Sequence, residues 1–162
     1  PRRRRCVLTS LAPPRPLMTA HRGQPPGPTD ADQGIWQGQK IARRFLSPDG
    51  MVVLVGKSAD DNDILSLKLG APRDFWLHVA ADSGSHVVVR NPDGLERCPR
   101  ATLRFAAGLA AGYSKLASGG QVAVHVATCE DISKPRGLAP GKVQLARFTT
   151  VRAAPLRGTP KA

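Results

Sequence analysis

Apolar and polar side chains alternate through two neighbouring segments near the middle of the chain, residues 74–79 and 84–90. Successive side chains of a strand point to opposite faces, so this alternation predicts two strands paired across a turn at 81–84. One face is apolar, as a core requires, and comprises Phe75, Leu77, Val79, Val87 and Val89. The other face combines an indole, two imidazoles and a guanidinium, from Trp76, His78, His86 and Arg90.

Similar patterns predict further strands. An apolar run over 51–55 follows a Pro-Asp-Gly turn sequence at 48–50, which predicts a hairpin with the segment before it. Residues 121–127 alternate between inner valines and an outer histidine, namely Val122, Val124, Val126 and His125. The last two strands are predicted over 143–148 and 149–153.

Two segments favour helices. Ser58, with an aspartate three residues later, resembles a capping box and predicts a helix over 58–70, although the alternating leucines within it also fit a strand. A second helix is predicted over 99–117, where a proline suits the first turn and many Ala and Gly residues allow close packing on a sheet. Together these elements predict one α+β domain, a mostly antiparallel sheet packed by one long Ala-rich helix.

The two ends of the chain differ from its middle. Residues 1–34 are rich in Arg, Pro and Gly and lack apolar periodicity, which predicts a disordered basic segment. Since the first methionine is Met18, residues 1–17 are interpreted as an over-extended start; a basic arm that adds non-specific RNA affinity is the alternative. The folded domain is expected over 35–155 and a flexible tail over 156–162.

Charge narrows the choice of partner. The formal net charge is +12, of which residues 1–44 carry +7 and residues 45–162 carry +5. An excess of this sign favours an anionic partner, most commonly nucleic acid. The three cysteines are widely spaced without a CxxC pair, so we expect no disulfide or zinc site and a cytoplasmic location. No run reaches the roughly 20 apolar residues of a membrane span, so no membrane partner is expected.

The polar face of the central strand pair is the first candidate site. Trp76 is suited to stacking on a nucleobase, Arg90 to stacking or pairing with phosphate, and the histidines to donating hydrogen bonds to phosphate or sugar. These are the interactions that single-stranded or looped RNA uses. The alternative is a buried tryptophan beside satisfied histidines in a small core.

A loop at 132–143 is the second candidate. Three cations, Lys134, Arg136 and Lys142, lie among prolines and glycines that keep side-chain bulk low, an arrangement suited to the phosphate backbone. A solvated basic loop is the alternative. Lys57 and Asn62 form a third cluster after a predicted strand, where the asparagine either reads a base edge or caps a helix.

Catalysis has no comparable signature. His78, His86 and His125 lack a carboxylate or thiolate that the sequence places beside them, so we expect no metal and no cofactor. Nor does the chain show a complete set of nucleophile, base and orienting group, so no catalytic residue is predicted. A ribonuclease that uses two histidines and a lysine remains open.

Several motifs occur in the order found in one known family. Gly-Lys-Ser at 56–58 with Asn62, the two strand segments, the Ala-rich helix ending in Tyr-Ser, and the loop motifs Lys-Pro-Arg-Gly and Pro-Gly-Lys lie within 43–155. In this respect the chain resembles the NFACT RNA-binding domain. The resemblance implies RNA binding, and tRNA as the RNA.

In full-length members, the resemblance further implies a place on the large ribosomal subunit, in quality control of stalled ribosomes, where this domain contacts tRNA near its anticodon arm. Those proteins also promote tailing of the nascent chain and carry additional domains, so this chain is similar to a stand-alone RNA-binding domain, and tailing does not carry over. The alternative is an RNA-processing or tRNA-modification enzyme, or its RNA-binding subunit. An adaptor that binds only protein is a third reading.

Overall fold

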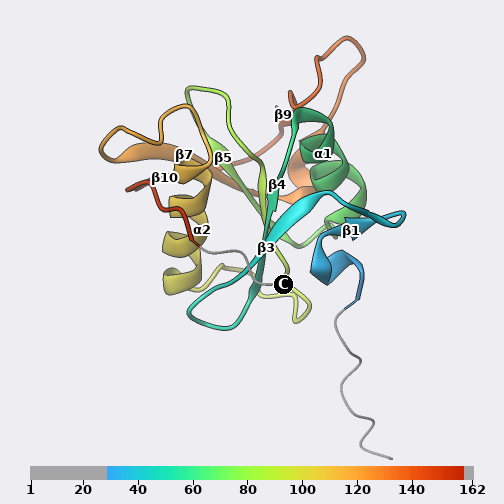
Figure 1. Ribbon diagram of the computed structural model, residues 1–162, viewed down its shortest axis with the longest axis horizontal. Helices are drawn as coiled ribbons and strands as arrows, with labels where there is room; N and C mark the ends of the chain where they lie inside the picture. The colour runs from blue at the N-terminus through green and yellow to red at the C-terminus, as the bar shows by residue number, and fades with distance from the viewer. Residues whose placement is uncertain (1–28, 159–162) are drawn as a thin grey trace, which may run out of the picture.

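The computed structural model describes residues 29–158 (Figure 1). Its helices are α1 (Ala59–Ile64) and α2 (Arg100–Gly112), with a π-helical turn η2 (Leu65–Leu69) directly after α1 and short 3-10 turns η1 (Ala31–Gln33) and η3 (Cys129–Asp131). Its strands are β1 (Ile35–Trp36), β2 (Gln39–Lys40), β3 (Ala42–Leu46), β4 (Val52–Gly56), β5 (Phe75–Val79), β6 (Val87–Val89), β7 (Val122–Thr128), β8 (Ile132–Ser133), β9 (Gln144–Leu145) and β10 (Thr149–Ala153).

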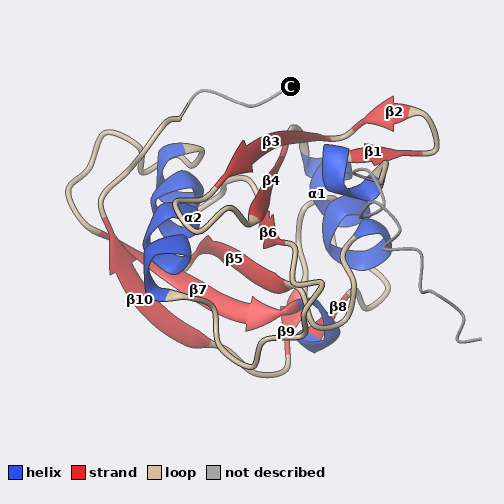
Figure 2. Ribbon diagram, turned by 90° about the horizontal axis from the view of Figure 1, so that it is seen from below, coloured by secondary structure: helices blue, strands red, loops and turns tan. Residues whose placement is uncertain are grey.

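One six-stranded antiparallel sheet organises the domain, in the order β10-β7-β5-β6-β4-β3. Helix α2 covers one face, while α1 and η2 lie on the other (Figures 1 and 2). Two small hairpins, β1-β2 and β8-β9, are attached to this body. The predicted α+β class and its mostly antiparallel sheet are therefore confirmed. Within the described residues no helix is long and apolar enough to cross a membrane.

Both faces of the sheet are buried, which gives the domain two cores. Between the sheet and α2 lie the five apolar residues predicted for the inner face of β5 and β6, together with the alanines of the helix. On the opposite face, Trp76 and Val88 pack with Leu65 and Leu69 of η2. The predicted exposed face of the central strand pair is thus largely covered by the helical segment that precedes it.

The helix predicted over 58–70 is present, and its start follows the capping signal. The Ser58 side chain accepts a hydrogen bond from the backbone N–H of Asp61 at 3.1 Å. Helix α2 is shorter than predicted, because the chain turns back after Gly112. Ser114 forms an isolated bridge with Gly84 at that turn, so residues 113–117 are not helical.

The ends of the described chain are more ordered than predicted. Residues 29–34 include η1 and pack beside the sheet, although the sequence predicted disorder there. Residues 156–158, predicted as flexible tail, lie along α2. The other predicted end segments, 1–28 and 159–162, lie outside the described residues. Of the strand predicted over 143–148, only Gln144–Leu145 pairs, with β8.

Candidate nucleic-acid interface

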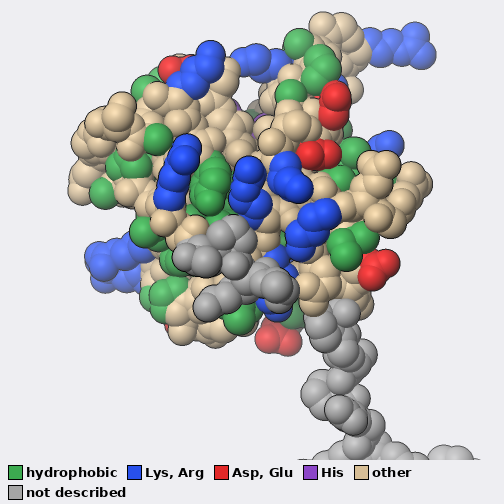
Figure 3. Space-filling view, viewed as in Figure 1, with side chains coloured by type: hydrophobic (Ala, Val, Ile, Leu, Met, Phe, Trp, Pro, Cys, Tyr) green, Lys and Arg blue, Asp and Glu red, His purple; other side chains and the backbone are tan. Residues whose placement is uncertain are grey.

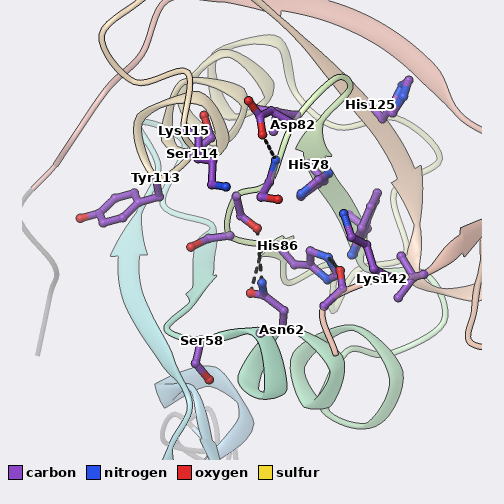
Figure 4. A pocket seen from close by; sticks show the side chains of 18 of the residues that line it. Ser58, Asn62, His78, Asp82, His86, Tyr113, Ser114, Lys115, His125 and Lys142 are labelled. Atoms are coloured by element: carbon purple, nitrogen blue, oxygen red, sulfur yellow. Dashed lines mark hydrogen bonds between the residues drawn. The ribbon is translucent and has the colours of Figure 1, made fainter. Parts of the chain in front are cut away.

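A groove with a volume of about 900 Å³ opens where four segments meet. The start of α1, the connection between β5 and β6, the turn after α2 and the base of the β8–β9 hairpin border it (Figure 4). The groove therefore lies where loops converge at one end of the sheet, and the hairpin beside it projects from the body (Figure 1).

Positive charge dominates the lining of this groove. It contains five cationic side chains and one carboxylate, namely Arg43, Lys57, Lys115, Lys142, Arg157 and Asp82. Over residues 29–158, none of the five cations takes part in an ion pair. Figure 3 shows Lys and Arg side chains gathered in a band across the face seen in Figure 1, with few acids among them. Such a surface attracts a polyanion.

Three aromatic rings form the floor. The rings of Trp76 and His78 are stacked, with centroids 5.9 Å apart, and the ring of His86 meets each of them edge-on at 5.1 Å. Trp76 and His86 are each only 1% exposed, whereas His78 is half-buried. The prediction that Trp76 and His86 lie on an exposed face is wrong, and the alternative of a buried tryptophan beside a satisfied histidine is the one observed.

A continuous chain of hydrogen bonds holds this floor. The Trp76 indole N–H donates to Ser66 Oγ at 2.8 Å, Ser66 Oγ lies 2.7 Å from His86 Nδ1, and His86 Nε2 lies 3.1 Å from the carbonyl oxygen of Gly141. A carbonyl oxygen only accepts, so Nε2 carries the proton, and in the neutral ring Nδ1 accepts from the serine hydroxyl. Each polar side-chain atom in this series of hydrogen bonds therefore has a partner.

Burial keeps two of the three histidines that line the groove, His86 and His78, uncharged near neutral pH. It lowers the pKa of His86 to about 4, helped by the neighbouring His78. Burial also lowers the pKa of His78, although the backbone of Gly84 partly offsets this. Opposite His78 in the β5–β7 register lies His125, whose ring contacts Phe148. Among residues 29–158, no three His, Cys, Asp or Glu side chains are grouped closely enough to hold a metal ion.

Asn62 is a structural residue of the groove wall. Its Oδ1 accepts from the backbone N–H of His86 at 3.0 Å, and its Nδ2 donates to the carbonyl of Gly84 at 3.3 Å. A Cβ at Gly56 would lie 2.0 Å from the same Oδ1, so only glycine permits this approach. The side chain is buried, and neither predicted role, reading a base edge or capping the helix, describes it.

Lys134 organises the β8–β9 hairpin from within. Its ammonium lies 3.0 Å from Asp63 Oδ2 and donates to the carbonyls of Ala139 and Lys142, both at 2.8 Å. These three partners use all three N–H donors, so the predicted phosphate contact of Lys134 is not supported by its geometry. Arg136, by contrast, is exposed near the tip, and Lys142 reaches the groove.

Arg90 lies outside the groove and joins the N-terminal segment to the sheet. Its Nε is 3.1 Å from Asp32 Oδ1, and its Nη1 is 2.7 Å from Asp74 Oδ2. Burial alone would raise the pKa of Asp32, but hydrogen bonds from Thr29 and Arg90 outweigh it and lower that pKa. Arg90 lies on the sheet face that the alternation predicted, next to Leu69 of η2, but its side chain is partly buried and ion-paired there, so the predicted exposure is wrong.

The structure thus brings together six of the nine predicted site residues around one groove: Lys57, Asn62, Trp76, His78, His86 and Lys142. Arg90, Lys134 and Arg136 do not line it. Sequence reasoning missed Arg43, Tyr113, Lys115 and Arg157. Arg43 and Lys115 belong to no motif with a recognisable spacing, and their only signal was the general excess of positive charge.

Comparisons with known proteins agree with this geometry. The family model described as the NFACT protein RNA binding domain matches residues 41–147. The chain is 33% identical over 115 residues to the Rqc2 homolog RqcH of Bacillus subtilis (strain 168), and 34% identical over 113 residues to that of Streptococcus suis (strain 05ZYH33). These alignments cover 71% and 69% of this chain, and 20% of each relative.

Two further similarities extend the comparison. The Ribosome quality control complex subunit NEMF homolog of Drosophila melanogaster is 31% identical over 70 residues, covering 43% of this chain and 7% of that protein. The solved C-terminal part of the fibronectin/fibrinogen-binding protein from Streptococcus suis superposes with a TM-score of 0.67 at 31% identity, covering 73% of this chain and 47% of that one. The chain therefore spans about a fifth of the RqcH relatives' length, and it belongs to the NFACT RNA-binding domain family.

Proposed function

We propose that this chain binds tRNA through the groove, as an RNA-binding component of ribosome quality control in the cytoplasm. The observation that carries the proposal is the charge of the groove, five cations against one carboxylate, in a domain of an RNA-binding family. A relative named for ribosome quality control supports the cellular process. From the family resemblance we also propose the large ribosomal subunit as a partner.

The groove suits a folded RNA better than a flat strand. Its cations stand on the rim, while its floor consists of neutral rings, of which only His78 is open to a ligand. Phosphates are thus expected at the rim and a sugar or base edge above His78. A backbone that curves over a concave site, as in the arms of a tRNA, meets several rim cations at once.

The same geometry supports binding in preference to RNA processing. A general base or acid needs a free ring nitrogen and a pKa near the working pH. Both ring nitrogens of His86 are already hydrogen-bonded, and burial lowers its pKa to about 4. Burial also lowers the pKa of His78, the one floor ring open to a ligand. We therefore propose that the groove binds RNA without cleaving or modifying it, and that it needs no metal or cofactor.

Titration of fluorescently labelled tRNA at increasing KCl tests the proposal. Three to five phosphate contacts predict a log–log slope of roughly −2 to −4, at about 0.7–0.9 per phosphate. Lys57→Glu and Lys142→Glu should each weaken binding about fivefold or more, whereas Lys68→Glu, an exposed lysine outside the groove, should not. Affinity independent of salt, or equal effects of all three variants, would contradict the groove as the binding site.

A further inference from the structure

The segment after β10 runs back along α2 and is fixed there. The backbone N–H of Leu156 donates to the carbonyl of Gly108 at 2.9 Å. A Cβ at Gly112 would lie 2.0 Å from the Leu156 carbonyl oxygen, and one at Gly108 would lie 3.0 Å from the Leu156 Cβ. Two helix glycines therefore let this segment approach the helix, and any larger residue at position 112 would displace it.

This docking carries Arg157 to the rim of the groove. Its Nε donates to the carbonyl of Gly112 at 2.9 Å, and its guanidinium carbon lies 5.2 Å from the centre of the Tyr113 ring. Arg43, which comes from β3 at the other end of the chain, places its guanidinium carbon at the same distance from the same ring. Both guanidinium carbons lie 5.2 Å from the centre of the Tyr113 ring, so they are separated by no more than twice that distance.

Nothing within the described chain neutralises this pair of charges. No carboxylate forms an ion pair with Arg43 or Arg157 in residues 29–158. A guanidinium held at an aromatic face keeps its full charge, and its free N–H groups remain available in the planar fork that fits phosphate oxygens. Pre-positioning by the ring also reduces the side-chain entropy that binding would otherwise cost.

We propose that Arg43, Tyr113 and Arg157 form a phosphate clamp for the RNA backbone, called here the Tyr113 clamp. The inference rests on the proposed function of the groove and adds a second contact region to it. Figure 4 shows Tyr113 on the side of the groove opposite Lys142, pointing away from His78 and His86. A bound RNA strand therefore spans the groove from the hairpin side to the Tyr113 clamp.

One residue of the clamp, Arg157, lies outside the matched family region, whereas Arg43 and Tyr113 lie within it. The family model ends at residue 147, so Arg157 and the segment that delivers it lie beyond the match. Arg157 touches the RNA in this proposal, while Tyr113 is a positioning residue, and the two roles predict different behaviour in the variants below.

Salt-dependent tRNA binding of variants made in the whole 162-residue chain tests the clamp. Arg43→Ala and Arg157→Ala should each weaken binding about fivefold and reduce the log–log salt slope by about 0.7–0.9. Gly112→Ala keeps every charge but displaces the delivering segment, so it should reproduce the affinity loss of Arg157→Ala. Tyr113→Leu should weaken affinity about two- to threefold while the slope is retained, because both charges remain. Arg152→Ala, which removes an exposed arginine on β10 outside the groove, is the matched control and should change neither quantity.

The outcomes separate this inference from the proposed function. One outcome refutes the clamp alone. In that outcome tRNA affinity depends on salt and is weakened by Lys57→Glu, but Arg43→Ala and Arg157→Ala leave it unchanged, as Arg152→Ala does. The groove would then remain the proposed RNA site without the clamp. If the wild-type chain does not bind tRNA with a salt slope, both proposals fail. If Gly112→Ala lowers the melting temperature so far that its affinity cannot be measured, the two arginine variants alone decide the matter.

Discussion

Replacing Trp76 by alanine is expected to destabilise the domain without weakening the RNA affinity of the molecules that remain folded. The indole is 1% exposed and packs among Leu54, Leu65 and Val88 in the core beneath η2. Removing a buried aromatic ring of this size costs about 3–5 kcal/mol. A typical domain is stable by only about 5–15 kcal/mol, so the loss is a large share of the total.

The hydrogen bond of the indole adds a separate, smaller contribution. Trp76→Phe keeps most of the ring but removes the N–H that donates to Ser66, and it should cost about 1–2 kcal/mol. Trp36→Ala, a half-buried tryptophan in β1 at the edge of the same core, is the matched control and should cost less than Trp76→Ala.

Urea unfolding and tRNA titration on the same samples measure both quantities. The expected result for Trp76→Ala is a lower unfolding midpoint, with an unchanged dissociation constant once it is corrected for the folded fraction. If the unfolding free energy stays within about 0.5 kcal/mol of wild type while affinity drops tenfold, the indole is an exposed stacking platform and the description of this core is refuted.

Three further predictions concern the residues that hold the site. The pKa of His86 is about 4 in the folded protein and 6.5 in the unfolded chain, so the unfolded chain takes up a proton first as the pH falls. The free energy of unfolding should therefore drop by up to about 3 kcal/mol between pH 6.5 and pH 4. Urea unfolding at each pH measures this drop, and His86→Gln should flatten it. Arg90→Ala should cost about 3 kcal/mol in thermal unfolding, because it leaves the buried Asp74 carboxylate without its cation; a cost equal to that of an exposed arginine would argue against this role. Gly56→Ala should cost about 1–3 kcal/mol through displacement of Asn62, and amide exchange of the β5–β6 connection should accelerate.

Alternation predicted the central strand pair and its apolar face, because the period of two follows from strand geometry whatever surrounds it. The same alternation said nothing about what covers the second face. The Ser66 hydroxyl is hydrogen-bonded to both the Trp76 indole and the His86 imidazole, the two groups that the sequence pattern assigned to RNA binding. A serine within a leucine-rich segment has no sequence pattern that predicts hydrogen bonds to side chains elsewhere in the chain.

The charged residues show a second limit. Three cations in the 132–143 loop indicated an anion site, but Asp63, far earlier in the chain, binds one of them. Composition counts charges and cannot tell which are neutralised by a distant partner. Arg157 shows the converse, since it lay in a predicted flexible tail and reaches the groove only because Gly108 and Gly112 admit the segment that carries it.

Photochemical crosslinking of tRNA to the chain, followed by mapping of the modified peptides, shows whether RNA binds in the groove. Crosslinks are expected at His78 and in the segments that border the groove: the start of α1, the turn after α2 and the base of the β8–β9 hairpin. None are expected on the exposed side of α2, which carries Arg100 and Arg104 away from the groove. Crosslinks confined to α2, with the groove peptides unmodified, would show that RNA binds elsewhere.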